Sequence, residues 1–191
     1  MKKLFRTGVA CVAFAASMGM ATAAQAQDSA SADAFAEILD AFTLTKNTDL
    51  QFGAVVLATG NAGTVTLNPT DGSRNCDGGS GDILCSGTTG LATFSIEGGT
   101  TGKTVRIDFS EVTNLVNGVT VGGGADETIV LSGMTTNKTL VTPAAGTSYY
   151  TAALVGGGST TDFSVGGTIS FDGAETVGTY TGSFVVAVDY L

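Results

Sequence analysis

Two cysteines, Cys76 and Cys85, are the residues whose type and spacing point most directly to chemistry. They do not form a C-x-x-C redox motif, and no further cysteine or histidine lies nearby to complete a zinc site. The third cysteine, Cys11, falls in a segment that we expect to be removed. A single remaining pair in an exported chain favours a disulfide. We therefore predict a Cys76–Cys85 disulfide that closes a short loop and contributes roughly 2–3 kcal/mol.

The sequence contains no histidine, which excludes Ser-His-Asp and Cys-His catalysis and histidine-ligated zinc. A pair of carboxylates could still hydrolyse glycosides, and Asp108, Glu111, Glu127 and Asp172 are available. With 17 acidic residues in the chain, such pairs arise by chance, and the lack of tryptophan weakens a sugar-stacking groove. We therefore expect no enzymatic activity and no cofactor.

The acidic stretch around Cys76 can be interpreted as a calcium site, because hard cations bind clustered carboxylates and carbonyls. Its oxygen-bearing residues fall at the first, third, fifth, seventh and twelfth places of an EF-hand loop: Asp71, Ser73, Asn75, Asp77 and Asp82. Cys76 stands where that loop needs its glycine, however, and no helices flank the stretch. The sequence leaves open whether this loop binds calcium or is a plain polar loop, and we assign no metal site.

The first 26 residues have the pattern of a secretory signal peptide. Lys2, Lys3 and Arg6 form a basic start, an apolar run follows, and Ala24-Gln25-Ala26 is a small-x-small cleavage site. No later stretch is long and apolar enough to span a bilayer. We expect export to the periplasm and onward to the cell surface or the medium.

Removal of these residues makes the chain strongly acidic. The mature protein, residues 27–191, keeps five basic and 17 acidic residues, a net charge of −12. Such a charge makes nucleic acid and anionic lipid poor partners. Its 165 residues fit one domain.

The final stretch, Gly178–Leu191, shows the period of two that is typical of a β-strand. Its even positions form an apolar row interrupted by Gly182, and the odd positions are mostly polar. The row consists of Tyr180, Phe184, Val186, Val188 and Tyr190. Such a strand needs another extended segment to cover its apolar face.

Short alternating runs separated by Gly, Asn, Asp, Ser and Thr continue this pattern through the chain, which predicts an all-β, antiparallel β-sandwich. We expect strands at 50–57, 63–67, 91–97, 104–109, 127–132, 137–140, 149–155, 163–171 and 180–191. The segment 68–90 lacks a strand-like run and is predicted to be a protruding loop tied by the disulfide.

The segment before these strands can be interpreted in two ways. As a strand it places Ile38, Phe42 and Leu44 on one face with a row of alanines, and as a helix it places Phe35, Ile38, Leu39 and Phe42 on one face. Thr43 and Thr45 favour an extended strand from Ile38 onward. We divide the chain into a signal peptide at 1–26, an N-terminal extension at 27–45 and a sandwich domain at 46–191.

The C-terminal stretch also resembles the C-terminal signature of chaperone-usher fimbrial subunits. Gly178 is the fourteenth residue from the end and Tyr190 the penultimate, with alternating apolar residues between them. Together with TKNTDLQFG at 45–53 and GTVTLNP at 63–69, it is similar to a family of small secreted bacterial domains of unknown function. That family is similar to pilins, which implies an immunoglobulin-like, pilin-like sandwich.

In the fimbrial family, an incomplete sandwich is filled by a strand from the next subunit. The resemblance implies a groove formed by Gly178, Tyr180, Phe184, Val186, Val188 and Tyr190, with Ile38, Phe42 and Leu44 as the donor strand. The implied partners are further copies of the chain and a periplasmic chaperone and usher. Two departures count against a direct transfer: the cysteines lie close together, and the donor is rich in alanine.

Two functions remain open at this stage. The first is a fimbria-like structural subunit that polymerises by strand donation. The second is a monomeric secreted sandwich that fills its own groove and binds a partner or a carbohydrate through its loops. A strand that swaps between copies and one that folds back on its own sheet have the same sequence.

Overall fold

The computed structural model describes residues 29–57, 60–78, 83–117 and 128–191, and the predicted signal peptide lies outside these ranges. The chain divides into two units, residues 1–37 and the compact unit Ile38–Leu191. Residues 29–37 are exposed and carry no regular structure. Within the described ranges every regular element is a β-strand, and no helix is present that could cross a membrane.

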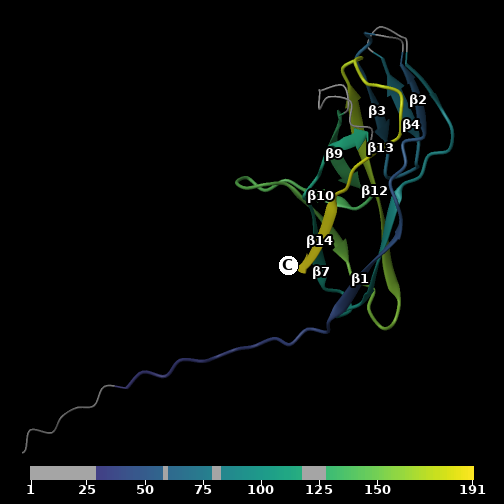
Figure 1. Cartoon of the computed structure of the whole chain (residues 1–191). Coiled ribbons are helices and arrows are strands. Elements are labelled where there is room, and N and C mark those ends of the chain that lie inside the picture. The colour runs from purple at the N-terminus through teal and green to yellow at the C-terminus, as the bar shows by residue number, and fades with distance from the viewer. Residues whose placement is uncertain (1–28, 58–59, 79–82, 118–127) are drawn as a thin grey trace, which may run out of the picture. The chain divides into compact units, whose positions relative to one another are not determined.

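The compact unit is built from antiparallel strands in three sheets (Figure 1). Their bounds are β1 Phe42–Thr48, β2 Ala54–Leu57, β3 Gly63–Leu67, β4 Arg74–Asp77, β5 Ile83–Ser86, β6 Ala92–Gly98, β7 Thr104–Ser110, β8 Leu115–Asn117, β9 Thr128–Thr136, β10 Thr139–Val141, β11 Tyr149–Ala153, β12 Thr160–Phe171, β13 Tyr180–Thr181 and β14 Val185–Tyr190. The largest sheet has the order β1-β6-β12-β9-β8-β13, with β3 beside β12 and β4 beside β3. The second has the order β10-β11-β7-β14, and the third pairs β2 with β5. The all-β, sandwich-like fold predicted from the sequence is confirmed.

A first core fills the space between the largest sheet and the β10-β11-β7-β14 sheet. Alternating side chains of β6 and β12 supply one side of it, and those of β7 and β11 supply the other. Phe94 and Phe163 are paired across β6 and β12, and their rings stack with centroids 5.3 Å apart. The rings of Phe94 and Phe184 meet edge to face at 6.4 Å, so the segment that leads into β14 contacts this core.

A second core lies on the other half of β12. Its buried residues are Phe52, Val65, Leu67, Ile129, Leu131, Ile169 and Phe171. The opposing layer is smaller than in the first core, because it consists of the two-stranded β2-β5 sheet, whose partly buried residues include Val55, Leu57 and Ile83. The two halves of the sandwich are therefore covered unequally.

The segment 68–90 differs from the loop that the sequence predicted. It contains β4, which extends the largest sheet beside β3, and β5, which pairs with β2. These strands have four residues each, and β4, Arg74–Asp77, is mostly polar, so neither shows an apolar alternation long enough to predict a strand. β8 was missed for a similar reason, because it has three residues.

Tyr190 joins the start of β1 to the end of β14. Its hydroxyl donates to the carbonyl oxygen of Asp40 at 2.6 Å and accepts from the backbone N–H of Thr100 at 2.9 Å. Its ring meets that of Phe42 edge to face at 5.2 Å. These contacts close one end of the sandwich.

Tyr190→Phe is expected to lower the free energy of unfolding by about 1–2 kcal/mol, because two hydrogen bonds are lost while the ring stays. Chemical denaturation of the mature protein measures this value. Tyr149→Phe is the matched control, since it keeps the ring that lies 4.5 Å from the Arg106 guanidinium. Equal stability of both variants would show that the hydroxyl of Tyr190 contributes nothing.

Candidate functional site

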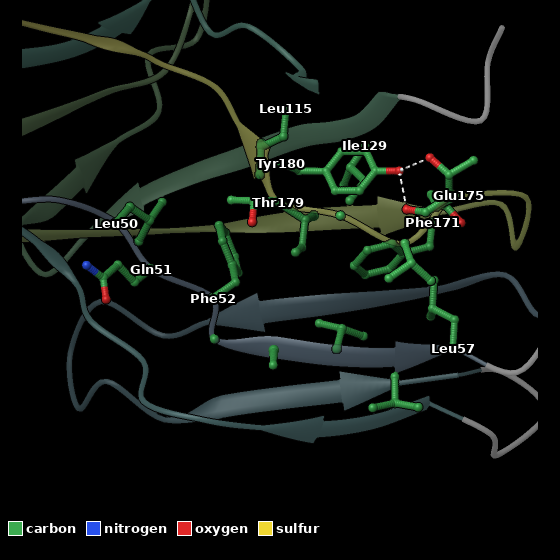
Figure 2. A pocket seen from close by; sticks show the side chains of 18 of the residues that line it. Leu50, Gln51, Phe52, Leu57, Leu115, Ile129, Phe171, Glu175, Thr179 and Tyr180 are labelled. Carbon is green, nitrogen blue, oxygen red and sulfur yellow. Dashed lines mark hydrogen bonds between the residues drawn. The ribbon is translucent and has the colours of Figure 1, made fainter. Parts of the chain in front are cut away.

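A cavity of about 730 Å³ opens on the thinly covered second core. One side is formed by Leu50–Leu57, the opposite side by Glu175–Tyr180, and the floor by apolar residues that include Ile129, Ile169 and Phe171. In Figure 2, Phe52 and Leu57 lie across the cavity from Tyr180. The cavity therefore separates the segment that contains β2 from the segment that leads into the C-terminal strand.

Both sides of this gap present a strand edge without a partner in the described chain. β2 pairs with β5 on one side, and β14 pairs with β7 on one side; β13, upstream of β14, pairs with β8. The other edges of β2, β13 and β14 face the gap or solvent and carry no strand among the residues described. An uncovered edge exposes a row of backbone N–H and C=O groups that can pair with a further strand.

The apolar row of the C-terminal segment is covered incompletely. Tyr180, Phe184, Val186, Val188 and Tyr190 are all half-buried. The apolar row of β12 differs, because Phe163, Val165, Ile169 and Phe171 are buried. The open edge thus coincides with apolar surface that the chain does not hide by itself.

Polar groups around the cavity are engaged in local turns. The Glu175 carboxylate accepts from the backbone N–H groups of Asp172 at 2.8 Å and Gly173 at 3.0 Å. The Tyr180 hydroxyl donates to the carbonyl oxygen of Thr176 at 2.8 Å. Glu175 is the one charged residue in the lining that the structure describes. This chemistry suits apolar side chains and a backbone better than a reactive substrate.

Gly178 is required by a close approach. A Cβ atom at this position would lie 2.2 Å from Nδ2 of Asn117, whose side chain is buried. Any larger residue would push the lining segment away from β8 and change the width of the cavity. This packing explains why a glycine occupies position 178.

The structure places the six residues of the predicted groove in two groups. Gly178 and Tyr180 line the cavity, whereas Phe184, Val186, Val188 and Tyr190 lie along the first core. Sequence reasoning missed the opposite wall, which Leu50, Phe52, Val55 and Leu57 provide. Their apolar run predicted a strand, but nothing in the run indicated that one edge would stay open.

The three residues of the predicted donor strand are also separated. Phe42 and Leu44 belong to β1, which pairs with β6 of the same chain, and both pack against the first core. Ile38 precedes the strand and is 96% exposed, and Phe35 is 93% exposed. The strand starts at Phe42, four residues later than the sequence suggested. The helical alternative for 27–46 is wrong for the described residues 29–46.

The predicted disulfide between Cys76 and Cys85 is confirmed, with the two Cα atoms 6.4 Å apart. It joins β4 of the largest sheet to β5, the strand that pairs with β2. The bond therefore links the floor layer to one wall of the cavity. A disulfide is consistent with an exported protein.

The acidic residues singled out in the sequence lie in ordinary turns and on strand surfaces. Oδ1 of Asp71 accepts from the N–H and the hydroxyl of Ser73, and these bonds lower the pKa of Asp71. Asp108 forms a salt bridge with Arg106 on the same strand. Glu127 and Asp82 lie outside the described residues. Within the described part of the chain, no three metal-binding side chains gather.

Comparison with known proteins identifies a family. Residues 42–190 match the family model described as Domain of unknown function (DUF4402). No curated protein and no solved structure matches the chain.

Proposed function

Because the chain belongs to the DUF4402 family, whose function is unknown, we propose its function from its own groove. The protein is a non-enzymatic surface subunit that assembles into a fimbria-like polymer by β-strand donation. The observation that carries this proposal is the cavity of about 730 Å³ between two strand edges that pair with no further strand among the described residues. An extended segment in that gap would pair with the free edges and cover the half-buried apolar row.

The segment that precedes β1 is the donor in this proposal. Residues 29–37 are exposed and without regular structure, so this segment belongs to no strand of its own unit. Phe42 and Leu44 are used within their own sheet, which confines the donor to residues before β1. Ile38 is the member of the predicted donor set that remains exposed.

The ends of the compact unit favour an open polymer over a closed dimer. β1 begins beside Tyr190, the last residue of β14. The cavity lies instead beside Leu57, the last residue of β2, and Tyr180, the first residue of β13. The donor and the acceptor are different surfaces at opposite ends, which makes the contact heterologous. Heterologous contacts that do not close form filaments.

Export of such a subunit requires protection of the open edge until assembly. A periplasmic chaperone that pairs with β14 through a strand of its own would supply this protection, as β-strand addition allows. This partner is part of the proposal.

Deletion of residues 27–39 tests the donor role. We expect the mature protein to form polymers and the deletion variant to remain monomeric, with thermal stability unchanged, because β1 is kept intact. Multi-angle light scattering after size-exclusion chromatography and negative-stain electron microscopy measure the assembly. A second variant, in which residues 29–39 are replaced by a Gly/Ser segment of equal length, controls for the length of the extension.

Polymers that persist in both variants would contradict strand donation by the extension. A full-length protein that stays monomeric at every concentration would support the alternative, a self-complemented monomer that binds a partner or a carbohydrate through its loops.

A further inference from the structure

We propose a register for the donated strand, an inference that rests on the proposed function. The extension of a second copy runs antiparallel to β14, its even-numbered row from Ala30 to Ile38 faces the core, and the side chain of Ile38 enters the cavity beside Tyr180. Phe35 points away from the core, toward solvent.

Charge decides which face of the extension turns inward. A strand alternates its side chains, so residues 30–38 offer an even face and an odd face. The even face carries Ala30, Ala32, Ala34, Ala36 and Ile38, and the odd face carries Asp33, Phe35 and Glu37. Burial of a carboxylate over the apolar floor would cost several kcal/mol, because the described lining of the cavity contains no cation. The even face therefore lies against the core, although the odd face holds the aromatic ring.

The sizes of the paired side chains fix the position along the groove. In antiparallel pairing, residues directly opposite each other share a face. A register with Ile38 opposite Tyr180 places Ala34, Ala32 and Ala30 opposite Phe184, Val186 and Val188. The small alanine side chains of the donor then lie opposite the larger side chains of the acceptor, which already pack against the first core. The one large residue of the row meets the cavity, where the acceptor leaves space.

The direction of the donor follows from the same placement. With Ile38 at the cavity, the donor leaves the acceptor at the end where β2 and β13 lie, and continues into Phe42 of its own unit. Phe42 marks the opposite end of that unit, beside Tyr190. Successive units then stack end to end. The reverse direction would bring the two like ends of neighbouring units together and would not give an end-to-end stack.

A matched pair of substitutions tests this register in the full mature chain. Ile38 and Phe35 are exposed to nearly the same extent, 96% and 93%, so Ile38→Asp and Phe35→Asp should leave the stability of the monomer unchanged. We expect Ile38→Asp to raise the protein concentration needed for half-maximal assembly roughly 100-fold, because the carboxylate would be buried. Phe35→Asp should shift it less than about threefold. Light scattering over a concentration series measures both values.

The outcomes separate the register from the proposed function. Assembly that fails for Phe35→Asp, alone or together with Ile38→Asp, overturns the outward position of Phe35. Assembly that survives Ile38→Asp while deletion of residues 27–39 abolishes it overturns the position of Ile38 and leaves strand donation standing. Assembly that survives the deletion as well overturns the proposed function.

Discussion

Phe94→Ala is expected to lower the free energy of unfolding by about 3–5 kcal/mol. Phe94 lies on β6, the strand between β1 and β12, and its ring stacks on Phe163 and meets the edge of Phe184. Its removal leaves a void between the two sheets of the first core. Neighbouring strands cannot collapse into this void, because pairing on both sides of β6 holds them in place.

Urea denaturation of the mature protein at fixed low concentration measures this loss. Leu84→Ala is the control, because Leu84 lies on β5, is 68% exposed and should change stability by less than about 0.5 kcal/mol. A loss below 1 kcal/mol for Phe94→Ala would show that the described packing does not stabilise the fold.

The double variant Cys76→Ser with Cys85→Ser is expected to lose roughly 2–3 kcal/mol of stability and, in addition, to assemble more weakly. The loss of stability arises because the unfolded chain has more conformational entropy when the disulfide no longer closes this loop. The second effect is local: without the disulfide, the β2-β5 sheet loses its covalent link to β4 and the largest sheet. One wall of the cavity then moves more freely, so in the proposed assembly a donor strand would have to order this wall on binding.

Assembly measured with and without dithiothreitol distinguishes these effects. The reductant should weaken assembly of the wild-type protein to the level of the double variant and should not change the variant itself. Conditions well below the unfolding transition keep global stability out of the comparison. Equal assembly with and without the disulfide would show that the wall is held by packing alone.

The sequence predicted the elements whose pattern is long and regular. β3 was predicted residue for residue, and β6, β7, β11 and the second half of β12 came close, because alternating side chains such as Phe94 and Ile96 face a two-sided core. β4, β5 and β8 were not predicted, because strands of three or four residues are too short to show a period of two.

The candidate site could be predicted only on one side. The row from Tyr180 to Tyr190 shows in its own alternation that it needs a cover, and the structure leaves it half-buried. The opposing wall depends on where the chain crosses from β1 to β2 between Thr48 and Ala54, and therefore on long-range pairing with β6 and β5. Such pairing depends on the whole fold and cannot be predicted from the residues of this segment alone.

The position of the cavity at the end remote from the first residue of β1 has a consequence for any filament built from this chain. The filament would have a direction. One tip would expose a groove with no donor strand in it, and the other tip would expose an N-terminal extension that is bound to no groove. Growth could be stopped at each tip by a different terminal component, one that lacks an extension or one that lacks a groove. The length of the filament would then depend on the supply of these two components.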